Sequence, residues 1–155
     1  GSTNVSGLNI NLIRLADVYL MAAECAIEQS DLPRALFLVN RVRARAALLP
    51  PKTVAGGALA AKYSVGQYPS FSSPEYARNA VRFERRLELA LEGHRFFDLV
   101  RWGTVKPTLE AYFRFEGGFF QYLQGITIEP RDSYFPLPQD QIDRSQGILK
   151  QSPQY

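Results

Sequence analysis

The residues best suited to chemistry are the charged side chains between positions 84 and 98. Glu84, Glu88 and Glu92 repeat every four residues, so on a helix they would lie along one face. Such a like-charge series costs an isolated helix roughly a few tenths of a kcal/mol per step, so nearby cations must compensate it. We therefore predict an internal ion-pair network that fixes helix orientation, with Glu84, Arg85, Arg86, Glu88, Glu92, Arg95 and Asp98 as members.

These carboxylates make a poor catalytic set, because carboxylates placed among arginines on helices are usually structural. His94 is the only histidine, and the G-x-S-x-G pattern of a serine hydrolase is absent. One histidine and one cysteine cannot supply a zinc site, and H-E-x-x-H is also missing. We predict a protein that is not an enzyme and has no metal or cofactor. Cys25 lies among alanines, which favours a small buried side chain.

Two helices are expected to carry the first charged positions. From Asn9 to Gln29 the few charges fall within one narrow stripe, which predicts a mostly buried helix. Ser30 and Asp31 then offer a cap, and Pro33 suits the first turn of a second helix that runs to Ala46. The pair forms a helical hairpin with the dimensions of a tetratricopeptide unit.

The carboxylates of the first helix need partners, because a nearly apolar helix cannot leave them buried and uncompensated. We expect Arg43, or a neighbouring arginine of the second helix, to pair with Asp17 or Glu24.

A second helix pair is predicted around Gly93. The apolar stripe of Phe83, Leu87 and Leu91 indicates a helix that Gly93 ends, with a backbone conformation awkward for other residues. A short aromatic helix follows from His94 to Trp102 and ends at Gly103.

Irregular segments separate these helices. Residues 49–74 are rich in Pro, Gly, Ala, Ser and Tyr, and residues 108–133 form a second such region, with a small hairpin considered around Gly117 and Gly118. Loops present side chains that have no duty in the core, so their aromatic residues are candidates for ligand binding. The candidates are Tyr63, Tyr68, Phe71, Phe119, Phe120 and Tyr122. Their loops are poor in basic residues, which suits a neutral, stackable ligand, but the same rings could instead pack the loops onto the helices.

The C-terminal tail from Tyr134 onward is apolar enough to dock. Pro136 and Pro138 exclude a long helix or central strand, and a short helical turn is expected near residues 139–143. We expect an ordered, proline-rich strap that runs back over the helices.

Composition narrows the class of protein. The chain has 155 residues, a net charge of +3 and no basic stripe, so nucleic acid is an improbable partner. No apolar run is long enough for a membrane span. We expect residues 1–8 to be linker or cloning residues and residues 9–155 to form a single domain.

Three stretches resemble the SusD/RagB family of outer-membrane glycan-binding lipoproteins. "ERRLELALEGHRFFDLVRWG" at residues 84–103 is similar to the family's C-terminal signature. "IRLADVYLMAAECA" at 13–26 and "ALFLVNRVRARA" at 35–46 resemble its paired helices. The tail "YFPLPQDQIDRSQGILKQSPQY" resembles its proline-rich motif, although Gln141, Ser152 and Gln154 depart from the pattern.

The resemblance implies a mainly α-helical C-terminal domain, a fragment of a longer protein. Its expected function is non-catalytic capture of an extracellular glycan or similar nutrient at the cell outer membrane. The implied partner is a SusC-like TonB-dependent transporter, and membrane association would come only from a lipid anchor that this fragment lacks. The alternative is a helical scaffold that contacts the transporter, with the ligand site in the N-terminal part.

Overall fold

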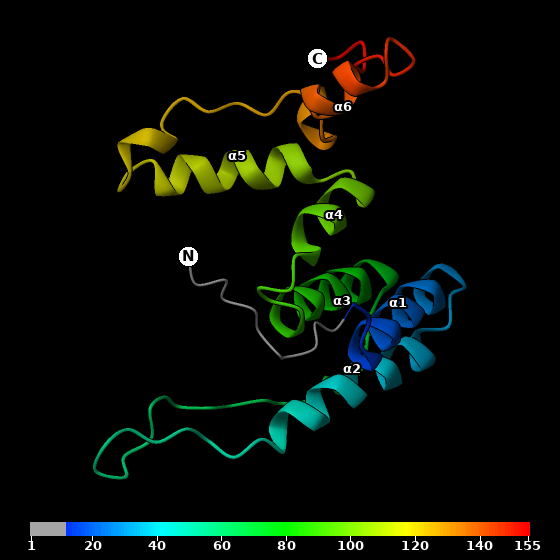
Figure 1. Cartoon of the computed structure of the whole chain (residues 1–155). Helices are drawn as coiled ribbons and strands as arrows, with labels where there is room; N and C mark the ends of the chain where they lie inside the picture. Colours follow the sequence, from blue (N-terminus) through cyan, green and yellow to red (C-terminus); the bar gives the residue numbers. More distant parts are fainter. Residues whose placement is uncertain (1–11) are drawn as a thin grey trace. The chain divides into compact units, whose positions relative to one another are not determined.

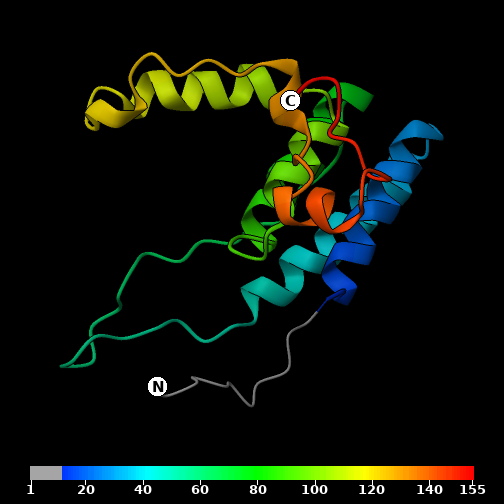
Figure 2. The same ribbon diagram turned by 45° about the horizontal axis from the view of Figure 1, so that its top comes forward.

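The computed structural model describes residues 12–155, and the described residues form six α-helices and two short 3-10 helices. This confirms the mainly α fold. The chain divides into two compact units at the junction of Glu92 and Gly93. Each unit is described separately, and Figures 1 and 2 show their elements from two directions.

The first unit is a bundle of α1 (Leu15–Glu28), α2 (Leu32–Ala47) and α3 (Pro74–Glu88), which pack side by side (Figure 1). The predicted hairpin of α1 and α2 is confirmed, while its likeness to a tetratricopeptide unit stays a prediction. Ser30 turns the chain with a φ of 63°, and the Asp31 carboxylate caps α2 by accepting from the Arg34 amide at 3.0 Å.

Helix α1 differs from its predicted form in extent and burial. It begins at Leu15 rather than Asn9, and residues 9–11 lie outside the described part of the chain. Leu15, Val18 and Met21 are 62%, 41% and 42% exposed, so the expectation of a mostly buried helix was wrong. The reason is that α2 and α3 cover only the side of α1 that carries Leu20, Ala23 and Ile27.

Helix α3 starts at a well-formed cap and stops earlier than predicted. The Ser73 hydroxyl accepts from the Tyr76 amide at 3.1 Å, and Pro74 occupies the first turn. The helix ends at Glu88, and residues 89–93 form turns that include Leu91 at a φ of 65°. Glu92 therefore lies beyond the helix that the four-residue spacing predicted for it.

Gly93 adopts a left-handed conformation with a φ of +82°, which confirms the expectation for this position. A Cβ atom there would meet no neighbour within 4 Å, so substitution acts through backbone strain alone. We expect Gly93→Ala to lower the free energy of unfolding by about 1 kcal/mol. Urea denaturation would measure this, with Gly66→Ala as control because Gly66 has open space without a positive φ. Equal effects of the two variants would contradict the assignment of strain.

The second unit contains α4 (His94–Arg101), α5 (Val105–Glu116), η1 (Gln121–Leu123), η2 (Pro130–Ser133) and α6 (Gln139–Arg144). The short helix predicted from His94 is confirmed. Helix α5 was not predicted, because residues 108–133 were expected to be irregular and a proline such as Pro107 disrupts the interior of a helix. Pro107 instead lies in the first turn, where its missing N–H breaks no helical hydrogen bond. The hairpin considered around Gly117 and Gly118 was wrong, since these residues end α5 and form a turn.

The tail forms more structure than an extended strap. The expected helical turn is confirmed by α6, and Phe135 packs its ring 5.7 Å from that of Phe96 in α4. Beyond α6 the chain folds back: the Gln151 side chain accepts from the Leu137 N–H at 3.1 Å and donates to its carbonyl at 2.9 Å. The Tyr155 hydroxyl lies within hydrogen-bond distance of the carbonyls of Arg131 and Tyr134, and its single hydrogen is shared between them. These bonds fix the tail as a closed loop.

Candidate ligand-binding site

The charged residues of the first unit are paired across helices. Arg85 and Asp17 are 4% and 6% exposed, and their ion pair joins α3 to α1 at 2.7 Å. Glu24 lies 4.0 Å from the same guanidinium. Arg43 pairs with Glu84 at 2.6 Å. The expected pairing of Arg43, or a neighbouring arginine of α2, with Asp17 or Glu24 was therefore wrong. Arg85 of α3 lies beside both carboxylates of α1. Arg43 pairs with Glu84 of α3 instead.

A second group of charges lies where α3 ends. Arg14, at the cap position before α1, pairs with Glu88 at 2.6 Å and with Glu92 at 2.7 Å. Arg45 also pairs with Glu88 at 2.7 Å. The hydrogen bond to Glu92 is the main reason that the pKa of Arg14 is raised, with burial acting against it. Sequence reasoning missed Arg14 and Arg45 as partners, because both lie far from Glu88 in the sequence.

The other residues predicted to belong to the ion-pair network are Arg86, Arg95 and Asp98. Arg86 is exposed on α3. In the second unit, Asp98 pairs with Arg101 at 2.8 Å, and the Arg95 guanidinium lies 5.8 Å from the centre of the Trp102 ring. The Asp98 carboxylate is bound by a cation, whereas an acid–base site presents two carboxylates to one cleft.

Cys25 is exposed on α1, so the prediction of a buried thiol was wrong. The alanines around it mark the buried side of the helix at Ala23 and Ala26, and Cys25 falls between these positions on the outer side. The neighbouring residue types alone could not indicate this.

The aromatic residues of the connection between α2 and α3 divide into two kinds. Phe71 is 8% exposed and belongs to the core of the first unit, and Tyr68 packs against that core. The Asn40 amide binds both the N–H and the carbonyl of Tyr68, at 2.9 and 2.8 Å. Burial raises the pKa of the Tyr68 hydroxyl. The connection between α2 and α3 projects from the bundle (Figure 2). Among these three rings only Tyr63, 54% exposed, remains available to face a ligand.

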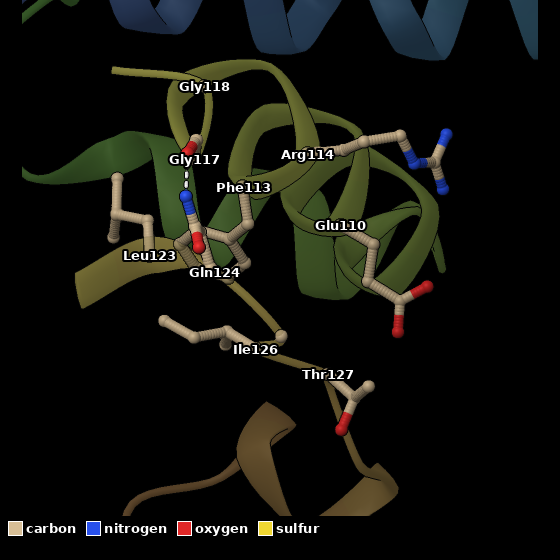
Figure 3. A pocket seen from close by; sticks show the side chains of 10 residues that line it. Glu110, Phe113, Arg114, Gly117, Gly118, Leu123, Gln124, Ile126 and Thr127 are labelled. Atoms are coloured by element: carbon tan, nitrogen blue, oxygen red, sulfur yellow. Dashed lines mark hydrogen bonds between the residues drawn. The ribbon is translucent and has the colours of Figure 1, made fainter. Parts of the chain in front are cut away.

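The second unit has a pocket of about 460 Å³ between α5 and the segment that runs back along it (Figure 3). Helix α5 contributes Glu110, Phe113 and Arg114. The remaining lining residues are Gly117, Gly118, Leu123, Gln124, Gly125, Ile126 and Thr127. The walls therefore combine apolar side chains with a few polar ones, which is the usual character of small-molecule sites.

Two side-chain clamps hold the returning wall of the pocket. The buried Ile128 donates its N–H to the Glu110 carboxylate at 3.1 Å, and its carbonyl accepts from the Lys106 ammonium at 2.6 Å. Lys106 also pairs with Glu110 at 2.8 Å, and this hydrogen bond is the main reason that the pKa of Glu110 is lowered. Ile128 lies in an irregular segment, and the side chains of Lys106 and Glu110 bind its backbone carbonyl and N–H as a neighbouring strand would.

The second clamp lies at the end of α5. Gln124 donates its side-chain amide to the Gly117 carbonyl at 2.7 Å (Figure 3). A Cβ atom on Gly117 would come within 2.7 Å of the Phe113 carbonyl oxygen and 3.4 Å of the Gln124 Cγ. The missing side chain of Gly117 therefore lets Gln124 approach the helix end closely.

Comparisons with known proteins place these features in a family. The family model described as the SusD family matches residues 1–155. The chain belongs to the SusD family. Over 140 residues it is 30% identical to SusD-like protein P25 of Formosa agariphila, covering 90% of this chain and 23% of that protein. Over 100 residues it is 32% identical to SusD-like protein P38 of the same organism, covering 64% of this chain and 18% of that protein.

A solved structure agrees with the sequence relatives. The crystal structure of a SusD homologue from Bacteroides thetaiotaomicron matches with a TM-score of 0.64 and 29% identity, over 99% of this chain and 30% of that chain. This SusD-family chain thus spans less than a third of the length of the relatives that it matches.

In this SusD-family chain, the second group of aromatic candidates lies on the same segment as the pocket wall. Phe119, Phe120 and Tyr122 are 72%, 47% and 75% exposed, and they sit between the lining residues Gly118 and Leu123. The rings of Phe120 and Tyr122 lie 5.8 Å apart. Exposed rings next to a pocket are available for stacking, in contrast to Phe71 in the core.

Sequence reasoning missed the polar residues of the pocket, Glu110, Arg114 and Gln124. A usable signal was present, because Lys106, Glu110 and Arg114 repeat every four residues on what proved to be α5. Recognising a helix here would have placed these three charged side chains on one helix face, in the stretch of chain that precedes Gly117 and Gly118. No helix among residues 12–155 is both long and apolar enough to cross a membrane.

Proposed function

We propose that this chain is the C-terminal domain of a SusD-family protein that captures an extracellular glycan or similar nutrient without catalysis. Capture takes place at the surface of the outer membrane, and the nutrient passes to a SusC-like TonB-dependent transporter. The observation that carries this proposal is the family match over residues 1–155. Residues 9–155 act as one domain in this proposal, although the described part consists of two compact units.

The pocket of the second unit supports a role in binding. Sugars expose hydroxyl groups and apolar C–H faces, so a site for them needs a few polar side chains beside apolar or aromatic ones. Gln124 and Thr127 provide the former, and Phe113 and Leu123 the latter. Tyr122, next to Leu123 in the chain, adds an exposed ring.

The pocket gives little support to catalysis. Glu110 is the single carboxylate among its lining residues, and its oxygen already accepts from Lys106 and from the Ile128 amide. A lowered pKa keeps this carboxyl ionised and unable to act as a general acid near neutral pH. We therefore propose a binding protein that needs no cofactor.

A second candidate function is a scaffold that contacts another polypeptide, such as the transporter, with the glycan site in another part of the protein. The observation that favours it is the exposed apolar side of α1, with Leu15 at 62% and Met21 at 42% exposure. Apolar side chains gathered on one helix face are typical of protein contacts.

Binding experiments on the full-length protein separate the two functions. A glycan array should identify a bound saccharide, and Tyr122→Ala should then weaken its binding severalfold without changing the melting temperature, because the ring is exposed. Tyr63→Ala tests the other exposed ring in the same way. Unaltered affinity in alanine variants of all four exposed candidates, Tyr63, Phe119, Phe120 and Tyr122, would favour the scaffold.

A further inference from the structure

The pocket of the second unit contains an arginine whose N–H groups have no hydrogen-bond acceptor among the described residues. Arg114 lines the pocket and is exposed on α5. Among residues 12–155 no side chain or carbonyl forms a hydrogen bond or ion pair with its guanidinium, although its charge contributes to lowering the pKa of Glu110. Its five N–H donors therefore remain available to a ligand.

Glu110 does not neutralise this arginine at contact distance. The two residues leave α5 one turn apart and on the same side (Figure 3). The Glu110 carboxylate is held by the Lys106 ammonium at 2.8 Å and by the Ile128 N–H at 3.1 Å. Glu110 is thus held by Lys106, and Arg114 is the single cation among the residues that line the pocket.

One further polar side chain of the pocket has a donor without a partner in the described part of the chain. The Thr127 hydroxyl has no hydrogen-bond partner among the described residues. Phe113, Leu123 and Ile126 provide apolar walls beside it. A guanidinium and a hydroxyl next to apolar surface suit a ligand that has both an anionic group and a C–H face.

We propose that this pocket binds an acidic saccharide, with Arg114 holding its carboxylate or sulfate group. The inference rests on the proposed function and sharpens it, because the aromatic loops by themselves suggested a neutral ligand. A planar guanidinium can bind either anion through two parallel hydrogen bonds, so the two sources share the same recognition chemistry.

The test uses the full-length protein and matched saccharides. Oligosaccharides built on galactose, glucose and mannose would each be offered in neutral, carboxylated and sulfated form, and affinities measured by calorimetry. We expect an acidic form to bind about tenfold more tightly than its neutral counterpart. The preference should shrink in 1 M salt, where charges are screened beyond about 3 Å. Whether the carboxylated or the sulfated form binds best identifies the source of the anion.

Variants then assign the preference to Arg114. Arg114→Gln should abolish it and leave binding of neutral saccharides unchanged, while Arg114→Lys should keep part of it through the retained charge. Arg144→Gln is the matched control, because it removes an exposed charge from α6 without touching the pocket. Equal or tighter binding of neutral saccharides would overturn the inference but leave glycan capture standing. An acidic preference that survives Arg114→Gln would also overturn it, and failure of all saccharides to bind would contradict the proposed function itself.

Discussion

Replacing Arg85 by methionine is expected to lower the free energy of unfolding by about 3–5 kcal/mol, because it leaves the buried Asp17 carboxylate without its partner. Asp17 is 6% exposed, and within the described residues the Arg85 guanidinium at 2.7 Å is its ion-pair partner. Methionine keeps most of the apolar volume of the arginine stem, so the effect comes from the stranded charge. Urea denaturation followed by circular dichroism would measure it.

Two further variants separate charge burial from packing. The double variant Arg85→Met with Asp17→Leu should recover most of the lost stability, because replacing both members of a buried pair by apolar residues is often neutral. Arg78→Met removes the exposed pair with Glu28 and should hardly change stability. A double variant as unstable as Arg85→Met alone would show that the arginine acts by packing.

Phe71→Ala is expected to destabilise the first unit by about 3 kcal/mol, because it opens a cavity in the core. The ring is 8% exposed and lies 5.6 Å from that of Tyr68 and 6.0 Å from that of Tyr76. Tyr63→Ala, in the same connection but 54% exposed, is the control and should leave the melting temperature unchanged. A loss below about 1 kcal/mol for Phe71→Ala would mean that the connection does not stabilise the bundle.

The sequence predicted those features that depend on the conformational preference of a single residue. The cap at Asp31 and the left-handed Gly93 follow from the preferences of single residues, and both are present. Helix α5 was missed because Pro107 is compatible with a first turn as well as with a helix end, and the sequence around it does not distinguish the two.

The ion pairs between helices and the pocket of the second unit could not be predicted from the preferences of single residues. Residue spacing limits which side chains share a helix face, but Arg85 meets Asp17 only because α3 packs on α1. The pocket likewise requires the chain after Gly117 to run back along α5, held by the Lys106 and Glu110 clamp on Ile128. Aromatic composition identified the segment that carries Phe119 and Tyr122, but it could not separate exposed rings from a core ring such as Phe71.

Hydrogen–deuterium exchange on the full-length protein, with and without a saccharide found by the glycan array, tests most directly that this chain binds the nutrient. We expect the saccharide to slow exchange in residues 110–127, which form the pocket of the second unit. The bundle of α1, α2 and α3 should exchange at the same rate in both states. Protection confined to parts of the protein outside residues 12–155 would contradict the account and leave this chain a scaffold.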